Sequence, residues 1–219
     1  MNLLLYGAPG SGKGTQADRL SESLGVPHVA TGQILREEVA KGSELGARAK
    51  KIMDRGDLVP DEVMIEIIAD RLRRADCASG FLLDGFPRTL PQAEALDRMI
   101  SGLGMKLDAV LYLRVEPEEL VNRLGNRWIC PCCGRTYSSP ANPPAEGNRC
   151  PIDGAELRQR EDDRPEAARR RIQVYLGETL PVLDYYRPRG VLWEIDGRGT
   201  IEEVSNRIDA VLPVRPPSQ

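Results

Sequence analysis

Short apolar runs alternate along this chain with longer stretches of mixed polarity. Each run is followed by turn-forming or polar residues, which is typical of buried strands in a parallel sheet. The five predicted strands cover residues 2–6, 27–30, 80–83, 109–115 and 191–195. Because helical stretches lie between them, we predict an α/β fold in which helices cover both faces of the sheet.

Two of the intervening stretches carry helix signals. Residues 60–74 begin with Pro60, Asp61 and Glu62, which favour a helix N-terminus. The apolar face of this predicted helix consists of Val63, Met64, Ile67, Ile68 and Leu72. Residues 165–187 are a long, charged helix candidate, in which Pro181 predicts a kink.

Two other stretches interrupt the alternation of strands and helices. Residues 31–59 are a helical excursion, and residues 127–163 are rich in Pro, Cys, Gly and Asn. Insertions of this size in a sheet scaffold are commonly lids or binding modules. We therefore predict a core domain of residues 1–30, 60–126 and 164–219, with inserted domains at 31–59 and 127–163. The proline-containing tail, residues 212–219, is expected to be loosely ordered.

Length and charge narrow the classes of protein. A chain of 219 residues can form one well-buried α/β domain with insertions, or two small domains. The apolar runs are far shorter than the ~20 residues of a membrane span, and no basic and apolar leader precedes the first strand. A net charge of −3 creates no basic field toward nucleic acid or membrane. We expect a cytoplasmic monomer that binds neither.

Basic residues and cysteines add two hints about chemistry. The chain has 25 Arg and only five Lys, which fits bidentate contacts to phosphate but also fits a codon-usage preference with solvated surface charges. Five cysteines, an odd number, argue against a disulfide framework and favour a metal site.

The first strand runs directly into a glycine-rich loop. Residues 7–15 read GAPGSGKGT. A strand that breaks into such a turn and then into a helix directs backbone N–H groups, a helix N-terminus and Lys13 toward one point, which predicts a phosphate site. The residue after the lysine departs from the strict pattern, because it is Gly14 and the hydroxyl follows one position later at Thr15.

Two short motifs in the second insertion predict a metal site. Residues 130–134 read CPCCG and residues 150–154 read CPIDG, so nearly the same turn occurs twice. Cys130, Cys133, Cys150 and Asp153 have zinc-type spacing, and four protein ligands make such a site structural rather than catalytic. The residues between the turns cannot build a core, so a metal would hold this insertion together.

Alternatives to that zinc site stay open on the sequence. The thiols are free of metal in one reading, and iron or cobalt replaces zinc in another. Cys132 is a spectator by its spacing, or a substitute for a neighbouring ligand. Cys77 is interpreted as a small apolar residue.

The loop at residues 7–15 and the hexapeptide DGFPRT at residues 84–89 resemble the signatures of the adenylate kinases. The resemblance extends over nearly the whole chain, and the cysteine pattern is similar to that of the long-form bacterial members with a zinc-bearing lid. It implies a P-loop nucleoside monophosphate kinase fold with a five-stranded parallel sheet. It also implies reversible, Mg²⁺-dependent phosphoryl transfer from ATP to AMP, giving two ADP.

The resemblance further implies roles for individual residues. The implied ATP contacts are Gly10, Ser11, Gly12, Lys13, Gly14, Thr15, Arg123, Arg127 and Gly199. The implied AMP contacts are Thr31, Gly32, Arg36, Val59, Gly85, Arg88, Gln92, Arg160 and Arg171. Lys13, Arg88, Arg123, Arg160 and Arg171 are the implied catalytic set. Arg123 and Arg127 would share one face if their helix continues.

The chemistry agrees with a chain that has only one histidine, His28, to which we assign a structural role. The nucleophile in transfer between nucleotides is an ionised phosphate oxygen, which needs no general base, so positioning and charge stabilisation remain. Asp84 is the expected anchor of Mg²⁺ through water, which would make a hydroxyl at Gly14 dispensable. Alternatively, Asp84 only caps the turn that follows it.

The sequence departs from the usual pattern of the adenylate kinases at three places, and it leaves two rival functions open. Gln33 replaces the usual Asp, Trp128 replaces a second arginine, and Gly125-Asn126 replaces a small residue followed by Gly. One rival function is a kinase for UMP or CMP on the same scaffold. The other is a nucleotide-switched binding protein in which residues 127–163 are a zinc ribbon, although few exposed aromatic residues are available there for base stacking.

Overall fold

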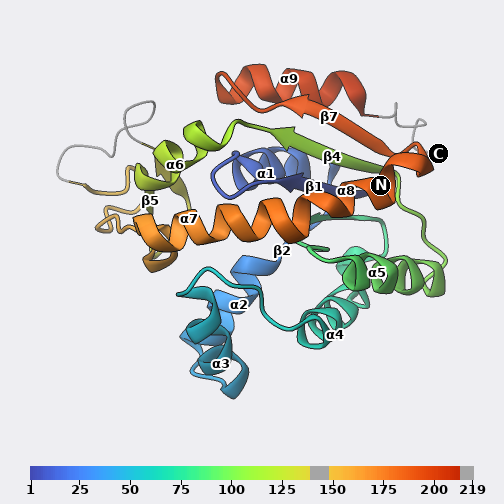
Figure 1. Ribbon diagram of the computed structural model, residues 1–219, viewed down its shortest axis with the longest axis horizontal. Helices are drawn as coiled ribbons and strands as arrows, with labels where there is room; N and C mark the ends of the chain where they lie inside the picture. The colour runs from blue at the N-terminus through green and yellow to red at the C-terminus, as the bar shows by residue number, and fades with distance from the viewer. Residues whose placement is uncertain (139–147, 213–219) are drawn as a thin grey trace.

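A five-stranded parallel sheet forms the centre of the molecule. The computed structural model describes residues 1–138 and 148–212 (Figure 1). The strands are β1 (Asn2–Gly7), β2 (His28–Ala30), β3 (Phe81–Asp84), β4 (Ala109–Arg114) and β7 (Leu192–Asp196), in the order β2-β3-β1-β4-β7. Each predicted strand is confirmed to within one residue at either end. Beyond Leu212, the predicted loose tail lies outside the described residues.

Helices cover both faces of this sheet, as its buried side chains require. Leu3 and Leu5 of β1 pack in one core cluster with α1 (Lys13–Leu24) and α9 (Ile201–Val211), whereas Leu4 and Tyr6 pack in another with α4 (Asp61–Leu72) and α5 (Leu90–Gly102). Successive residues of a strand point to opposite faces, so one apolar run supplies both cores. The apolar face predicted for α4 is confirmed, with Ile68 fully buried.

The first insertion consists of two helices that project from the body of the molecule (Figure 1). They are α2 (Thr31–Ala40) and α3 (Glu44–Met53). Ser43 caps α3 by accepting a hydrogen bond from the backbone N–H of Gly46 at 3.0 Å. A Cβ atom on Gly46 would lie 2.2 Å from the carbonyl oxygen of Glu38, so only glycine permits this close approach of the two helices.

The second insertion follows α6 (Pro117–Gly125) and begins with the antiparallel pair β5 (Arg127–Ile129) and β6 (Thr136–Ser138). The helix ends at Gly125 and does not continue, so the condition under which Arg123 and Arg127 would share one helical face is not met. Arg127 is already a strand residue, and the backbone of Ile129 is paired with that of Arg158 instead of continuing a helix.

The long helix predicted at residues 165–187 is interrupted around Pro181. It consists of α7 (Pro165–Val174), a π-helical turn η3 (Tyr175–Thr179), a 3₁₀ turn η4 (Leu180–Val182) and α8 (Leu183–Tyr186). Proline lacks a backbone N–H and clashes with the carbonyl one turn earlier, so regular α-helical bonding cannot pass through it. The remaining short turns are η1 (Ala75–Cys77), η2 (Glu161–Asp163) and η5 (Arg187–Arg189). Within the described residues, no helix combines the length and apolar character that crossing a membrane requires.

Candidate active site

The glycine-rich loop joins the carboxyl end of β1 to the first turn of α1. Gly10 and Gly12 have φ angles of 87° and 92°, in the left-handed region that favours glycine. Gly12 occupies the N-cap of α1 without a side-chain cap, which leaves the first N–H groups of the helix available to an anion. The loop therefore has the local geometry of a phosphate cradle.

Lys13 is folded over this loop. Its Nζ atom donates to the carbonyl oxygens of Gly7 at 2.6 Å and Ala8 at 3.0 Å. Burial lowers the pKa of Lys13 to about 8, although the carboxylate of Asp84 acts in the opposite direction. An anionic ligand would favour the charged form of this lysine.

Asp84 ends β3 beside the glycine-rich loop, and His28 stands next to it on β2. Nε2 of His28 lies 3.6 Å from Asp84, and Nδ1 lies 2.9 Å from Asp18. Burial works against the charged form of His28, but the hydrogen bond with Asp18 and the nearby charge of Asp84 raise its pKa to about 9. Burial likewise opposes ionisation of Asp84, yet His28 and Lys13 hold the pKa of this carboxyl below its ordinary value.

The turn after β3 orients Arg88. Its Nε donates to the carbonyl of Gly85 at 2.8 Å, and its backbone N–H donates to Oε1 of Gln92 at the same distance. Nε2 of Gln92 donates to Oδ1 of Asp61 at 2.6 Å. Asp61 therefore links the start of α4 to the start of α5 and fixes the Gln92 amide, whose second N–H hydrogen remains for another acceptor.

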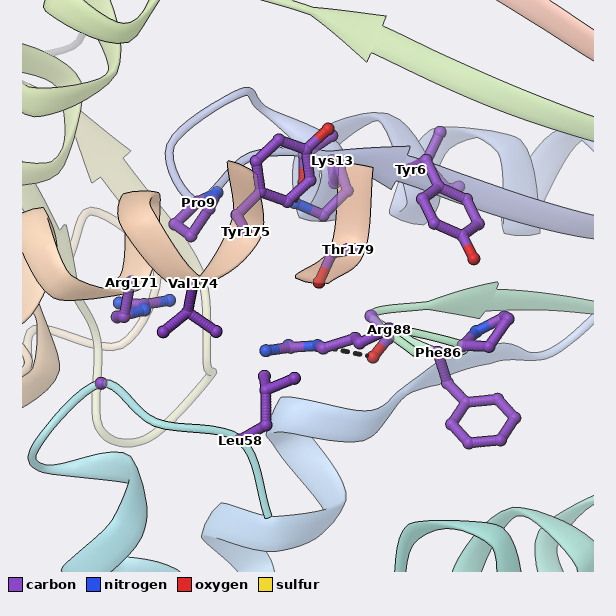
Figure 2. Close-up of a pocket in the computed structure, with 15 residues that line it drawn as sticks. Tyr6, Pro9, Lys13, Leu58, Phe86, Arg88, Arg171, Val174, Tyr175 and Thr179 are labelled. Carbon is purple, nitrogen blue, oxygen red and sulfur yellow. Dashed lines mark hydrogen bonds between the residues drawn. The ribbon is translucent and has the colours of Figure 1, made fainter. Parts of the chain in front are cut away.

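Two adjacent cavities meet at the carboxyl edge of the sheet. The first lies against the glycine-rich loop and is lined by Lys13, Arg88 and Arg171 together with Tyr6, Tyr175 and Thr179 (Figure 2). The second lies against α2 and is lined by Thr31, Gly32, Arg36, Val59, Gly85, Arg88, Gln92, Asp162 and Arg171. Arg88 and Arg171 line both cavities, and Figure 2 shows Arg88 extending toward Arg171. This edge is where ligands bind in open α/β sheets.

A buried carboxylate, Asp163, and a partly buried one, Asp162, pair with arginines of the second insertion and α7. Asp163 accepts from Nε of Arg127 at 2.7 Å and from Nη1 of Arg171 at 2.8 Å. Asp162 lies 3.0 Å from the same Nη1 atom. The acidic residues of η2 thus hold together two guanidinium groups that come from distant parts of the chain.

Arg36 and Arg160 have buried guanidinium nitrogens without such pairing. The Nε atoms of both have no hydrogen-bond partner among the described residues. Burial, together with the charges of Arg127 and Arg36, lowers the pKa of Arg160 to about 9, which still leaves this side chain charged at neutral pH. Nη2 of Arg36 is 3.5 Å from Oε1 of Gln33, and this neutral amide leaves the charge of Arg36 unneutralised at that contact.

Arg123 belongs to a separate group at the end of β7. Its Nη1 and Nη2 atoms donate to the carbonyl of Gly197 at 3.2 and 3.3 Å, and Nη2 also pairs with Glu119. Gly199 follows in the same turn with a φ angle of 102°. Arg123, Arg127, Arg160 and Gly199 do not line either of the two cavities described above.

The two cysteine turns come together in the second insertion. The carbonyl of Cys130 accepts from the N–H of Gly134 at 3.0 Å, and Cys150 and Gly154 repeat this contact at 2.9 Å. One ligand atom from each of Cys130, Cys133, Cys150 and Asp153 lies within 4.8 Å of every other. Cys132 is exposed and is not a member of this set.

The spacing of the ligand atoms fits a tetrahedral metal site. Sγ of Cys133 and Sγ of Cys150 are 3.6 Å apart, close to the ~3.8 Å that tetrahedral bonds of about 2.3 Å to zinc impose on two sulfurs. The same separation is far too long for a disulfide, whose sulfurs lie about 2.05 Å apart. These four residues could hold a divalent metal.

Comparison with known proteins agrees with this geometry. The sequence pattern of the family described as adenylate kinase matches residues 5–191. The chain is 52% identical to an adenylate kinase of Archaeoglobus fulgidus and 50% identical to one of Methanocella arvoryzae, and 49% identical to that of the bacterium Lysinibacillus sphaericus. Each match covers 97% of this chain and 98% of the relative.

The chain belongs to the adenylate kinase family. It is therefore a nucleoside monophosphate kinase, a phosphotransferase, and the fold class predicted from the sequence is confirmed. Nothing in these comparisons favours the two rival functions.

Many residues that line the second cavity were predicted from the sequence, but the hydrogen-bond partners of these residues were not. Every predicted AMP contact except Arg160 lies on the cavity wall. Asp162 and Asp163 were not predicted as partners of the arginines, and Asp61 was predicted only as a helix start. The signal available for the first two was the acidic run that follows Arg160 directly.

Proposed function

We propose that this adenylate kinase family member transfers the terminal phosphoryl group of ATP reversibly to AMP, giving two ADP. The observation that carries the proposal is the pair of adjacent cavities with Arg88 and Arg171 on both walls. One cavity borders the phosphate cradle and the other borders the α2 insertion, so two nucleotides can meet with their phosphates between the shared arginines.

On the donor side, the glycine-rich loop would hold the phosphates of ATP. The residues assigned are Gly10, Ser11, Gly12, Lys13, Gly14 and Thr15, supported by the uncapped start of α1. Lys13 would leave the carbonyls of Gly7 and Ala8 for a phosphate oxygen. Arg123 and Arg127 would reach the phosphates of ATP, and Gly199 would lie near its adenine.

On the acceptor side, the second cavity would bind AMP. Arg36 has an unpaired Nε and Arg88 faces the same cavity, so both are suited to its phosphate. Gln92 would use its remaining N–H hydrogen on the adenine edge. Thr31, Gly32, Val59 and Gly85 complete the wall.

The reaction needs charge stabilisation rather than proton transfer. An ionised oxygen of AMP attacks the γ phosphorus, a new P–O bond forms, and the bond to the β-phosphate oxygen breaks with the electron pair going to ADP. Lys13, Arg88, Arg123, Arg160 and Arg171 would neutralise the spreading negative charge and hold the reacting groups in line. Residues 127–163 would exclude water by closing over the donor.

The residues present also fit Mg²⁺ bound with ATP. Asp84 is a carboxylate at the end of β3 whose ionised form is favoured by the charges of His28 and Lys13, and a hard oxygen donor reached through water suits this ion. Mg²⁺ supplies charge neutralisation to the phosphates when bound. Asp84 would hold it there through water.

We assign structural zinc to the cluster of Cys130, Cys133, Cys150 and Asp153. Four protein ligands leave no open position for a substrate, so the metal would stabilise the fold of the insertion. We also propose that residues 31–59 form the AMP-binding domain and residues 127–163 the lid, on a core of 1–30, 60–126 and 164–219. The enzyme would act as a cytoplasmic monomer.

A substrate panel tests the proposal. Purified protein with Mg-ATP is offered AMP, UMP and CMP in turn while ADP formation is followed, and AMP should be used best. Preference for UMP or CMP would contradict the assignment, and absence of turnover with every acceptor would favour a binding protein. Lys13→Ala should nearly abolish transfer, whereas Lys51→Ala, at an exposed lysine of α3, should not.

A further inference from the structure

A tyrosine contacts the metal cluster of the second insertion without belonging to the ligand set. Tyr137 lies on β6 and is 7% exposed, in a small core formed with Cys130, Cys150 and Leu157. Its hydroxyl oxygen is 3.2 Å from Sγ of Cys150. Both side chains are buried, so water does not compete strongly for this contact.

We propose that Tyr137 is a positioning residue of the metal site, and that its hydroxyl donates a hydrogen bond to the Cys150 thiolate. The proposal rests on the proposed zinc site. A metal-bound cysteine has lost its proton, so the phenol must be the donor in this pair. Hydrogen bonds to ligand atoms orient the ligands and tune a metal site.

The charge of the cluster explains why such a donor is useful. Three thiolates and a carboxylate carry more negative charge than a divalent cation neutralises. Backbone N–H groups meet part of this excess, because those of Cys132 and Cys133 lie 3.4 Å from Sγ of Cys130 and that of Ala155 lies 3.0 Å from Asp153. Tyr137 adds a side-chain donor on the Cys150 side, and one substitution can remove it.

The ring and the hydroxyl of Tyr137 can be separated experimentally. The ring packs in the small core, and the residue pairs with Trp128 across the β5–β6 ladder. Tyr137→Phe keeps this packing and deletes only the donor. A purely structural tyrosine would then leave the metal unaffected.

The test compares the full-length wild type with Tyr137→Phe. Zinc affinity is measured by competition with a chromophoric chelator, and the thiolate-to-metal absorption band is recorded with cobalt in place of zinc. We expect zinc to bind about 10-fold more weakly or worse. The cobalt band should move to longer wavelength, because the sulfur electrons lose the stabilising hydrogen bond.

A matched control is Tyr185→Phe. Tyr185 lies on α8, outside the insertion, and its hydroxyl donates to Asp97 at 2.7 Å. Neither the zinc affinity nor the cobalt band should therefore change in this variant. An unaltered affinity and band in Tyr137→Phe would overturn the proposal. If the wild type itself bound no zinc or cobalt, the proposed metal site would fail instead.

A second measurement needs no variant and decides the question if Tyr137→Phe fails to fold. The wild type is loaded with a spin-half cadmium isotope and studied by NMR. A slowly exchanging Tyr137 hydroxyl proton coupled to cadmium through Sγ of Cys150 would support the proposal. A rapidly exchanging hydroxyl without this coupling would refute it.

Discussion

At the scale of single residues, Arg88 occupies the junction of the two cavities. Its backbone and Nε are fixed by Gln92 and Gly85, so the outer nitrogens of the guanidinium remain for ligands. Burial and the nearby charge of Arg171 lower its pKa, and an anion would relieve this repulsion. The side chain is thus held ready for a phosphate.

Replacement of this side chain should separate the two substrates. Arg88→Ala should weaken AMP binding at least 10-fold, because a charge-assisted contact is worth about 1.5–3 kcal/mol, while ATP binding changes much less. Titration calorimetry with each nucleotide measures both constants. Arg98→Ala, at an exposed arginine of α5, is the matched control. Equal losses for AMP and ATP would contradict the assigned role.

His28 should make stability depend on pH. Its folded pKa is about 9, against about 6.5 when unfolded, so between these values the folded state keeps a proton that the unfolded state releases. The stabilisation is complete below about pH 6.5 and disappears as pH rises through 9. We expect His28 to contribute roughly 1–3 kcal/mol to the free energy of unfolding, a range already reduced for solvent screening at the exposed Asp18.

Urea unfolding of the wild type and His28→Gln between pH 6 and 9.5 measures this contribution. The difference between the two curves isolates the histidine from other titrating groups such as Lys13. The wild-type advantage should shrink steadily over that interval. A constant difference at all pH values would show that the carboxylates do not stabilise a charged His28.

At the scale of elements, the α2–α3 pair depends on one close approach. Gly46→Ala should destabilise the protein by about 1–3 kcal/mol, because the new Cβ meets the Glu38 backbone at 2.2 Å. AMP affinity should fall as well, since α2 carries Thr31 and Arg36, while ATP affinity is retained. Urea unfolding and AMP titration provide the measurements.

The control for this prediction is Gly102→Ala at the end of α5. A Cβ atom there meets nothing within 4 Å, so the change should be neutral or slightly stabilising. Destabilisation of both variants to the same degree would mean that the packing of α2 on α3 is not the cause.

At the scale of the whole molecule, the described residues of the second insertion form only a small apolar core. Its buried cluster contains Cys130, Tyr137, Cys150 and Leu157, so two of four members are proposed ligands. Chelation of the metal, or Cys150→Ser, should lower the melting temperature by several degrees and leave residual activity. Differential scanning calorimetry checks this result, with Cys132→Ser as the control, because Cys132 lies outside the cluster. An unchanged melting temperature after metal removal would contradict a structural role.

The sequence by itself predicted the sheet, the glycine-rich loop and the four side chains that cluster at the cysteine turns. Each of these is encoded locally, by an apolar run, by glycine placement or by the spacing of two turns. Such local patterns in contiguous residues can be recognised without knowing which other parts of the chain pack against them. The turn that contains Cys130 and the turn that contains Cys150 are nearly identical. Their assembly into one cluster could therefore also be predicted from the sequence.

Only the tertiary structure decided which groups meet across long stretches of chain. Arg127 and Arg171 share Asp163, Gln92 is fixed by Asp61, and Tyr137 reaches Cys150. The tertiary structure also decided that α6 ends at Gly125, so that Arg123 lies on the helix and Arg127 on β5. Such contacts depend on how strands and insertions fold over one another. A local pattern reports the polarity of its own residues and carries no information about a distant partner.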